Sequence, residues 1–330
     1  MSAPLLLGID GGGTTTTAWL TDESGTVLGR GLAGPSNNKA VTGDRAREAL
    51  NQAIEHAFDD ADLSPRPVDV ACFGLAGYDR PGDKRQLEEW SAASRWTKRL
   101  VLVNDGDLVL AVGTPDYAGV AVIAGTGSIA VGRNRDGRIA RAGGWGYLLG
   151  DEGSAYAVAL AGLRLAVRRA DGRDALRRFR AKPKNDALTS NSRPNRRDAL
   201  TERLCHALGI LGPEHFIAAV YSTGLDRTQI AALAPAVVAA AVDDPDVVGW
   251  ILEPAGYELG QAVQAVALAL DWQEPLLPLA MAGGFLLSAR PVLDAMIGYL
   301  QKFGGHELAT ATVPEPVLGA VLLARKVLDA

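Results

Sequence analysis

The sequence predicts an α/β protein that consists of two related halves, each a sheet covered by helices. Apolar, strand-like runs alternate with segments of helical periodicity, a pattern typical of parallel or mixed sheets with helices on their faces. A strand that runs into glycines and threonines occurs twice, in Leu5–Leu20 and in Gly119–Val131. Two such units about 115 residues apart indicate a duplicated fold, with its boundary near Thr114–Tyr117. The chain of 330 residues is long enough for two cores.

The composition excludes several classes of protein. A hydrophobic content of 48% with 22% charged residues is ordinary for a globular protein, and a net charge of −5 does not favour nucleic acid as a partner. No run of about 18 apolar residues predicts a membrane span, and Met1–Pro4 carries no signal-peptide pattern. We therefore expect a cytoplasmic protein that binds neither nucleic acid nor membrane. Cys72 and Cys205 fit no metal or disulfide motif and predict two buried thiols.

The first glycine-rich hairpin is a candidate phosphate-binding turn. Leu5–Ile9 is an apolar run that predicts a buried strand, and Asp10 stands at its end. Gly11–Gly13 allow positive φ and the close approach of another group, while Thr14–Thr17 bring hydroxyls and favour a return strand. Backbone N–H groups and hydroxyls in such a bend can hold anionic phosphate oxygens. The pattern alone fits a plain turn as well.

The other elements of the first half follow from turn signals and periodicity. In chain order we expect a turn at Ser24-Gly25, a strand at Val27–Gly31, a loop at Gly34–Lys39, a helix at Gly43–Phe58, a strand at Val68–Leu75, a helix at Pro81–Trp96 and a strand at Leu100–Val103. Parallel strands present their carboxyl ends at one edge of a sheet, where ligands bind. Asp10, Gly77 and Asp105 should therefore meet at that edge.

The second half repeats the opening pattern and then becomes helical. In chain order we expect a strand at Gly119–Ala124, a glycine turn, a strand from Ile129, a turn at Asn134–Gly137, helices near Gly153–Arg169, Asp198–Leu208, Pro213–Tyr221, Ile230–Val242 and Val247–Leu270, a strand at Leu277–Met281, a helix at Pro291–Phe303, a strand at Glu307–Thr312 and a closing helix at Pro316–Leu328. The closing helix is expected to pack back on the first half.

Basic residues crowd the chain between Arg164 and Arg203, together with Pro183 and Pro194. The simplest interpretation is a solvated, mobile insert near residues 170–197. The alternatives are a lid that touches ATP phosphates and a surface that meets an acidic partner.

The second glycine turn also matches a dinucleotide-binding pattern, because Gly125–Ala130 reads G-x-G-x-x-A. That fingerprint opens a helix, whereas the residues here continue as a strand toward Asn134–Gly137, so we reject it. A Walker A lysine motif is absent as well. What remains is a pair of glycine and threonine turns, plus Gly283-Gly284, where a flat base could lie against the backbone.

Asp10 and Asp105 are the candidate catalytic carboxylates, because both end predicted strands at one edge. Phosphoryl transfer to a hydroxyl needs a divalent cation and a carboxylate that accepts the hydroxyl proton. Asp10, beside the first turn, suits water-mediated contact with Mg²⁺, and Asp105 suits the base. Asp107 competes with Asp105 for that role, and a turn cap is the alternative for each. The four histidines are scattered, which does not favour a histidine-centred mechanism.

Several motifs, in their order along the chain, resemble a known family. They are GIDGGGTTT from Gly8, GPSN from Gly34, Asn104-Asp105, GTGS from Gly125, GGWGYLLGDEGSA from Gly143 and AGG from Ala282. Together they resemble the N-acetylglucosamine kinase branch of the BadF/BadG/BcrA/BcrD ATPase family, within the actin-like sugar kinase superfamily. The match spans nearly the whole chain, and GGWGYLLGDEGSA is its most specific part.

The resemblance implies two ribonuclease-H-like lobes, the actin-like ATPase fold, formed by residues 1–115 and 116–330, with mixed sheets flanked by helices. ATP and a sugar would bind in the cleft between them, and the lobes would close. The ATP-binding residues would be Gly12, Gly13, Thr14, Thr15, Gly125, Thr126, Gly127, Gly283, Gly284 and Ser288. The sugar would contact Asn37, Asp105, Ser128, Ile129, Gly144, Trp145, Gly146, Tyr147, Leu148 and Asp151. Asp105 would take the proton of the 6-hydroxyl, with ATP and Mg²⁺ as cofactors, and we expect a homodimer.

Two departures from the family pattern bear on the substrate. Asn38-Lys39-Ala40 follows Asn37 where relatives often have an aromatic residue, and Thr15 stands where a basic residue is frequent. The sequence therefore predicts N-acetylglucosamine 6-phosphorylation, with glucosamine, N-acetylmuramic acid or glucose as alternative substrates. A sugar-responsive ATP-binding sensor is a second class of function. An electron-transferring activator ATPase would need closely spaced cysteines, which the chain lacks.

Overall fold

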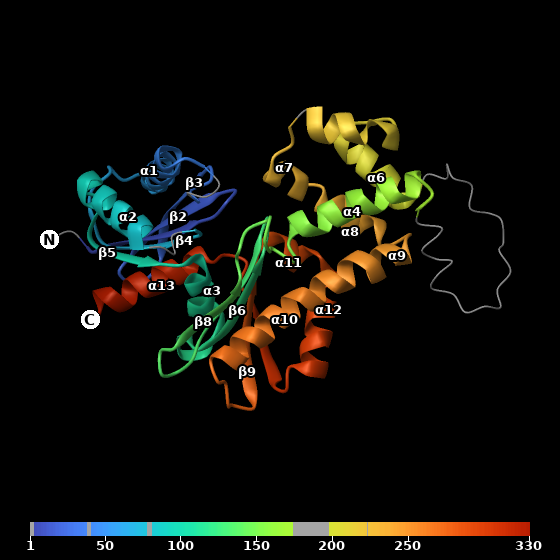
Figure 1. Ribbon diagram of the computed structural model, residues 1–330. Helices are drawn as coiled ribbons and strands as arrows, with labels where there is room; N and C mark the ends of the chain where they lie inside the picture. Colours follow the sequence, from blue (N-terminus) through green and yellow to red (C-terminus); the bar gives the residue numbers. More distant parts are fainter. Residues whose placement is uncertain (1–2, 38–40, 78–80, 174–197, 223) are drawn as a thin grey trace.

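The computed structural model describes residues 3–37, 41–77, 81–173, 198–222 and 224–330, and its strands form two five-stranded sheets (Figure 1). The first sheet has the order β3-β2-β1-β4-β5 and comprises β1 (Leu5–Gly11), β2 (Thr16–Asp22), β3 (Val27–Ala33), β4 (Val68–Leu75) and β5 (Thr97–Val103). The second has the order β10-β9-β6-β7-β8 and comprises β6 (Gly119–Ala124), β7 (Ser128–Arg133), β8 (Ile139–Gly143), β9 (Leu276–Ala282) and β10 (Glu307–Thr312).

The two sheets have the same topology. Strand β1 pairs antiparallel with β2 and parallel with β4, and β6 pairs in the same two ways with β7 and β9. The outer strands correspond too. Strand β3 pairs antiparallel with β2, as β8 does with β7. Strand β5 pairs parallel with β4, as β10 does with β9. The predicted duplication and the predicted mixed sheets are therefore confirmed. The division after residue 115 stays a prediction.

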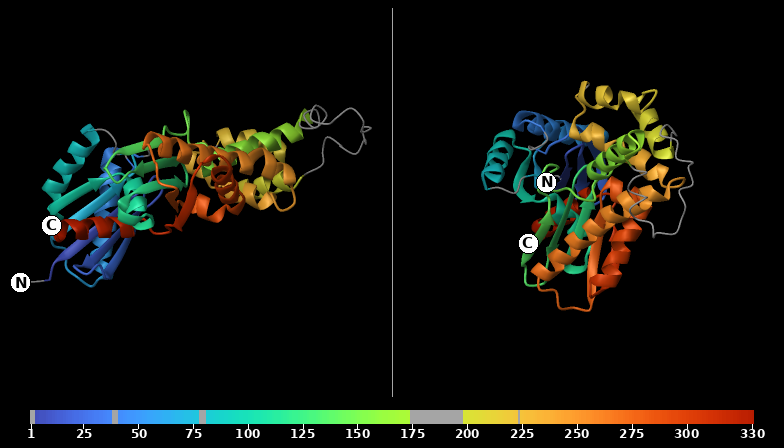
Figure 2. Two further views of the ribbon diagram at one scale, coloured as in Figure 1. Left: turned by 90° about the horizontal axis from the view of Figure 1, so that it is seen from below. Right: turned by 45° about the vertical axis from the view of Figure 1, so that its right-hand side comes forward.

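Helices cover both sheets. The first half contains α1 (Gly43–Asp60), α2 (Pro81–Ser94) and α3 (Asp105–Gly113). The second contains α4 (Ala155–Ala170), α6 (Ala199–Leu208), α7 (Arg227–Ala231), α8 (Ala234–Ala240), α9 (Pro245–Val247), α10 (Glu253–Ala269), α11 (Gly284–Ser288), α12 (Arg290–Phe303) and α13 (Val317–Leu328). Helices α4 and α6 to α9 form a helical segment that projects beside the sheets on one side of the molecule (Figures 1 and 2).

Helix α1 shows how the sequence produces this layering. Leu50, Ile54 and Phe58 recur at intervals of four residues, which places them on one face of the helix, and all three are fully buried. Each such side chain contributes about 1.5–3 kcal/mol when it leaves water. Glycine in β3 lets the helix approach the sheet closely, since a Cβ on Gly31 would lie 1.9 Å from the carbonyl oxygen of Ala53.

The closing helix α13 packs against the first sheet, although it follows the last strand of the second. Ala320 and Ala324 of α13 share one buried cluster with Leu6 of β1, Val70 of β4 and Leu108 of α3. The chain thus crosses between the lobes after α3 and again before α13, and both termini lie at the first lobe (Figure 1).

Several predicted boundaries differ from the structure. The largest difference is α3, because the sequence predicts no helix after the strand at Leu100–Val103, whereas Asp105–Gly113 is helical. The predicted helix from Ile230 is divided into α7 and α8, and the one from Val247 begins with a π-helical turn at Val248–Leu252. Strand β5 starts at Thr97, three residues before the predicted Leu100.

Two predictions lie outside the described residues: Lys39, and the basic insert between residues 174 and 197. The predicted thiols are confirmed, because Cys72 and Cys205 are free and buried. In the described part of the chain no single helix is both long and apolar enough to cross a membrane, while one bent pair, Ala199–Leu208 with Pro213–Ser222, meets those criteria by length and composition.

Candidate active site

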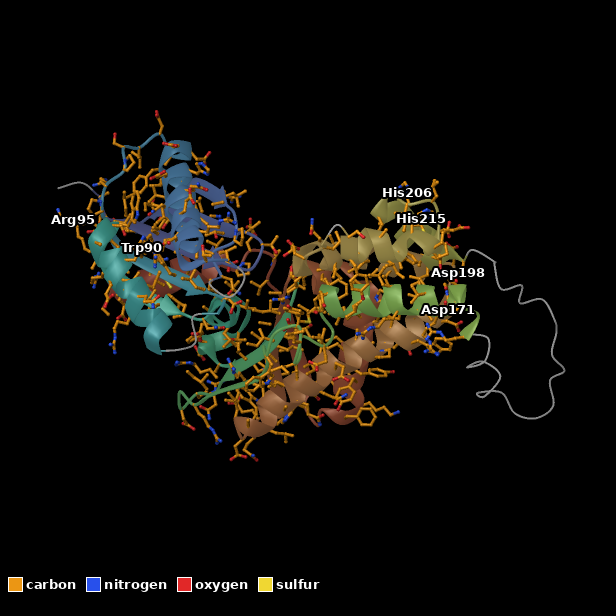
Figure 3. The ribbon with its side chains drawn as sticks, turned by 45° about the horizontal axis from the view of Figure 1, so that its top comes forward. Trp90, Arg95, Asp171, Asp198, His206 and His215 are labelled. Carbon is orange, nitrogen blue, oxygen red and sulfur yellow. The ribbon has the colours of Figure 1, made fainter. Side chains whose placement is uncertain are left out.

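A cleft of about 1810 Å³ lies between the two lobes and gathers most of the predicted site residues. It is lined by Asp10, Gly12, Gly13, Thr14, Thr15, Asn37, Asp105, Gly125, Thr126, Gly127, Ser128, Ile129, Gly144, Trp145, Gly146, Tyr147, Asp151, Gly283 and Gly284. Gly77 also lines it, so the predicted meeting of Asp10, Gly77 and Asp105 at one edge is confirmed. None of the four histidines lines the cleft; His206 and His215 lie on the outer part of the helical segment (Figure 3).

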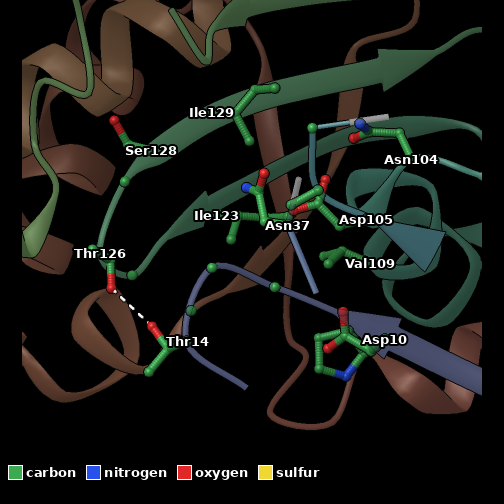
Figure 4. A pocket seen from close by; sticks show the side chains of 18 of the residues that line it. Asp10, Thr14, Asn37, Asn104, Asp105, Val109, Ile123, Thr126, Ser128 and Ile129 are labelled. Atoms are coloured by element: carbon green, nitrogen blue, oxygen red, sulfur yellow. Dashed lines mark hydrogen bonds between the residues drawn. The ribbon is translucent and has the colours of Figure 1, made fainter. Parts of the chain in front are cut away.

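The two glycine turns face each other across this cleft (Figure 4). The first turn is closed by a hydrogen bond from the Gly12 N–H to the Thr15 carbonyl, 3.0 Å long, and the second by the Gly125 N–H to the Gly127 carbonyl, 2.9 Å long. The hydroxyl oxygens of Thr14 and Thr126 lie 3.2 Å apart. Strand β7 follows the second turn directly, which confirms the rejection of a dinucleotide-binding helix.

The predicted sugar loop is fixed to the first glycine turn. The backbone N–H groups of Ser36 and Asn37 both donate to the Gly12 carbonyl at 3.2 Å, and the Thr16 hydroxyl donates to the Gly34 carbonyl at 2.7 Å. Asn37 and Asp105 both line the cleft (Figure 4). These hydrogen bonds would therefore fix the position of a group bound by Asn37 relative to a phosphate bound by the first turn.

Asp10 lies near the carboxyl end of β1 and keeps partial contact with the cleft. Burial, and to a lesser degree the charge of Asp105, raises the pKa of Asp10 to about 7. A nearby cation would favour the ionised form again. Among the described residues no group of three or more His, Cys, Asp or Glu side chains could hold a metal, so any ion here would depend on one or two carboxylates, waters and phosphates, as Mg²⁺ commonly does.

Asp105 is the first residue of α3, and the structure holds it there through a capping box. The Asn104 side chain accepts from the Gly106 N–H at 3.1 Å, and the Asp107 side chain accepts from the Asn104 N–H at 3.1 Å. A negative charge in the first turn of a helix is stabilised by the helix dipole, by about 0.3–1 kcal/mol at exposed sites. The carboxylate of Asp105 is thus aimed into the cleft from a rigid element (Figure 4).

Asp107 competes with Asp105 for the role of base, and its contacts are structural. One carboxylate oxygen accepts from the Asn104 N–H, as above, and the other accepts from the Tyr117 hydroxyl. Tyr117 lies in the segment that joins the lobes and has a φ of 61°, and the side chain of Arg133 stacks on its ring. Asp107 therefore connects that segment to the start of α3, although it lines the same cleft as Asp105.

Asp151 is almost fully buried, with 3% exposure, and is held by two partners. One oxygen accepts from the Ser128 N–H at 3.4 Å, and the other lies 2.7 Å from Nη2 of Arg227. Burial raises the pKa of Asp151, and the charge of Arg227 acts against that rise. Sequence reasoning missed Arg227, because nothing in its local pattern shows that the first residue of α7 reaches the cleft.

The glycine-rich stretch after β8 forms a loop at the cleft's rim. Gly143, Gly144 and Gly146 all have positive φ, between 70° and 84°, which side chains rarely adopt. Trp145 and Tyr147 line the cleft and remain 66% and 44% exposed. Guanidinium groups stack on both rings, Arg141 on Trp145 at 5.3 Å and Arg227 on Tyr147 at 5.7 Å. Leu148 is 80% exposed and is not among the lining residues, so its predicted sugar contact stays a prediction.

Gly283, between β9 and α11, also lines the cleft. Its φ is 96°, and a Cβ there would lie 2.4 Å from the carbonyl oxygen of Ala124. Only glycine fits, and the backbone is left open to the cleft, where Leu287 also lines the wall. The Ser288 hydroxyl donates back to the Gly284 carbonyl at 2.6 Å and does not line the cleft, so its nucleotide contact remains untested.

Two lobes of equal topology, with a glycine turn from each facing across the cleft and a final helix crossing back, define the actin-like ATPase fold shared by two-lobed sugar kinases. A solved structure of a proposed N-acetylglucosamine kinase from Chromobacterium violaceum has this fold, with a TM-score of 0.73 and 27% identity over 98% of this chain and all of that one.

The sequence comparison is more specific. The chain belongs to the BadF/BadG/BcrA/BcrD ATPase family, whose pattern matches residues 7–324. The N-acetylmuramic acid/N-acetylglucosamine kinase of Clostridium acetobutylicum is 29% identical over 98% of this chain and 99% of its own length. The N-acetyl-D-glucosamine kinase of Dictyostelium discoideum is 30% identical over 98% of both chains.

Proposed function

We propose that this protein is an amino-sugar kinase that transfers the γ-phosphoryl group of ATP to the 6-hydroxyl of N-acetylglucosamine. The observation that carries the proposal is the continuity between the two halves of the site. Gly12, in the first glycine turn, accepts hydrogen bonds from both Ser36 and Asn37 of the predicted sugar loop, and Asp105 lines the same cleft. These hydrogen bonds would hold the proposed phosphate and sugar sites together, in the cleft that Asp105 also lines.

The nucleotide would lie between the two glycine turns. Thr14 and Thr126 would bind its phosphates through hydroxyl and backbone donors, in the way that oriented N–H groups bind anions. The open backbone at Gly283 and Gly284 would accommodate the flat base. This assignment extends to Gly12, Gly13, Thr15, Gly125 and Gly127 as the remaining residues of the two turns.

Mg²⁺ fits the residues present, with Asp10 as its ligand through water. Burial and the charge of Asp105 raise the pKa of Asp10 to about 7, and a nearby cation would favour the ionised form again. When bound, the ion would neutralise phosphate charge. Asp10 would hold the ion beside the first turn, because it lies near the end of β1, directly before Gly11 and Gly12.

The sugar would lie at the end of the cleft formed by the rim loop and β7. Asn37 and Asp151 would bind its hydroxyls, Ser128, Ile129 and Gly144 would line its pocket, and Trp145 and Tyr147 would supply apolar walls. Asp105 would accept the proton of the 6-hydroxyl as the new O–P bond forms and ADP leaves. The name of the Clostridium acetobutylicum relative makes N-acetylmuramic acid the second candidate substrate.

An assay of ADP release tests this proposal, with N-acetylglucosamine, N-acetylmuramic acid, glucosamine and glucose compared at equal concentrations. We expect turnover with the N-acetylated sugars, dependent on Mg²⁺, and a 6-phosphate product by ³¹P and ¹H NMR. Binding of a sugar without any turnover would instead support a sensor. A preference of more than tenfold for glucose over both N-acetylated sugars would reject the amino-sugar assignment.

A further inference from the structure

Arg227 occupies a position between the two parts of the cleft. Its Nη2 lies 2.7 Å from the Asp151 carboxylate, and its guanidinium stacks on the ring of Tyr147 at 5.7 Å. A Cβ built on Gly127, in the second glycine turn, would lie 2.3 Å from the same Nη2. The guanidinium therefore touches the second turn, the buried carboxylate and the rim loop at once.

The ion pair is unusual in its surroundings. The Asp151 side chain is 4% exposed and that of Arg227 is 31% exposed, so both charges have lost much of their hydration. Nε of Arg227 is buried and makes no hydrogen bond. A buried ion pair seldom stabilises a fold more than apolar residues of the same size would, and an unsatisfied donor adds a further cost. The pair is therefore better explained by a role in function than by a contribution to the stability of the fold.

Helix α7 supplies the rigidity that such a role needs. Asp226 and Gln229 form a reciprocal capping box, in which each side chain accepts from the other's backbone N–H at 2.8 Å. Ala231 at the other end of the helix is buried in the core of the second lobe. Arg227 thus extends to Asp151 from a helix fixed at both ends.

We propose that Arg227 is a positioning residue for sugar recognition, which holds the Asp151 carboxylate in place to accept hydrogen bonds from the sugar's hydroxyl groups. This inference rests on the proposed function. A carboxylate accepts hydrogen bonds and cannot donate them while it is ionised, so a pair of this kind selects neutral hydroxyls that point toward Asp151. Arg227 itself need not touch the substrate, and it connects the helical segment to the sugar site.

The test compares Arg227→Met, which removes the charge at similar length, with Arg227→Lys, which keeps it. Arg203→Met is the matched control, because Arg203 lies on the same helical segment and pairs with Asp243 at 3.0 Å away from the cleft. We expect the N-acetylglucosamine Kd of Arg227→Met, measured by calorimetry, to rise roughly tenfold to a hundredfold, as for loss of a hydrogen bond to a charged group. The ATP KM should stay within about threefold, Arg227→Lys should recover most of the affinity, and the control should match wild type.

Two further readouts separate positioning from a structural role. In a double-mutant cycle, Arg227→Met should no longer change the sugar Kd once Asp151→Asn is present, because the cycle isolates the interaction between the two side chains. The charged groups acting on Asp151 are Arg227, which lowers its pKa, and Glu152, which raises it. Without Arg227 the pKa of Asp151 rises further, so the sugar affinity of Arg227→Met should fall as the pH is lowered through a range where wild type is flat.

The outcomes are distinguishable. If wild type neither binds nor phosphorylates any amino sugar, the proposed function fails. If wild type does both and Arg227→Met matches it in Kd and in pH profile, the role of Arg227 is rejected while the kinase assignment stands. If Arg227→Met unfolds, Arg227→Gln, which also removes the charge, takes its place: a rise in its Kd that is equal with and without Asp151→Asn would overturn the proposal.

Discussion

Thr14 and Thr126 contact each other across the cleft, their hydroxyl oxygens 3.2 Å apart although 112 residues separate them in sequence. They lie on the glycine turns of lobes with equal topology, so the duplicated halves meet at their corresponding loops. A phosphate held by both turns would have to replace this contact. If a nucleotide binds there as proposed, the turns would part or their side chains would rotate.

The first prediction concerns these hydroxyls. Thr14→Val and Thr126→Val should each raise the ATP KM by roughly tenfold, because each removes a donor to a charged phosphate. In the double variant the ATP KM should rise by less than the product of the two single increases, since both threonines act on one ligand. Thr312→Val, on an exposed strand position outside the cleft, is the control for the substitution itself. Equal ATP KM values in all variants would remove both threonines from the nucleotide site.

The second prediction separates the two carboxylates of α3. Asp105→Asn should lower kcat by roughly two to four decades, as loss of a general base does, and leave the Kd of ATP and sugar nearly unchanged. Asp107→Asn should instead reduce stability by about 1–2 kcal/mol, because it weakens the capping box and the Tyr117 hydrogen bond.

Single-turnover rates measured together with urea unfolding decide between them. A large rate loss in Asp107→Asn with a normal rate in Asp105→Asn would exchange their roles. A normal rate in both would move the base to another carboxylate, with Asp151 as the next candidate.

The third prediction follows from the pKa of Asp10, which burial and then Asp105 raise to about 7. An acid whose pKa is raised by folding contributes stability that is fully present below its unfolded pKa, near 3.8, and that is lost as the pH rises through about 7. At pH 8 the ionised Asp10 therefore destabilises the metal-free fold. Asp10→Asn should raise the metal-free Tm at pH 8 by at least about 2 °C, and the difference should shrink toward pH 4.

Magnesium provides the check on this argument. Mg²⁺ with ADP should raise the Tm of wild type more than that of Asp10→Asn, because a ligand that binds only the folded state stabilises it by mass action. The idea is wrong if the two proteins respond equally to Mg²⁺, or if Asp10→Asn is less stable than wild type at pH 8 without metal.

Much of this site was predictable because its residues carry local signals. The glycine and threonine residues indicate tight turns, and Asp10 follows an apolar strand. The alternation of strands and helices then predicts that Asp105 lies at the same edge of the sheet. Helix α3 was missed because Asp105-Gly106-Asp107 has the composition of a turn, and only the reciprocal bonds of Asn104 and Asp107 make it a helix start. The local sequence does not show whether these residues form a turn or the start of a helix.

Arg227 was missed for a different reason. Its partner Asp151 lies 76 residues away, and the pair depends on how α7 packs against the second lobe. Long-range contacts of single charged side chains leave no periodicity in the sequence. The same holds for the bond between Thr14 and Thr126, although the two turns themselves were foreseen.

The last prediction tests why glycine is needed after β9. Gly283 has a φ of 96°, and a Cβ there would lie 2.4 Å from the Ala124 carbonyl oxygen, whereas a Cβ on Gly284 would meet nothing within 4 Å. Gly283→Ala should therefore cost about 1–3 kcal/mol of stability through strain and clash, while Gly284→Ala should be neutral or slightly stabilising. Denaturant unfolding of the two variants measures this difference.

The same pair of variants also examines the base-binding role proposed for this backbone. Gly284 lines the cleft, and a methyl group there would meet no atom within 4 Å, so it would not strain the chain. If the base lies against this turn, Gly284→Ala should raise the ATP KM several-fold at unchanged stability and unchanged sugar Kd. An ATP KM equal to that of wild type would mean that Gly283 is kept for the fold alone, and that the base lies elsewhere in the cleft.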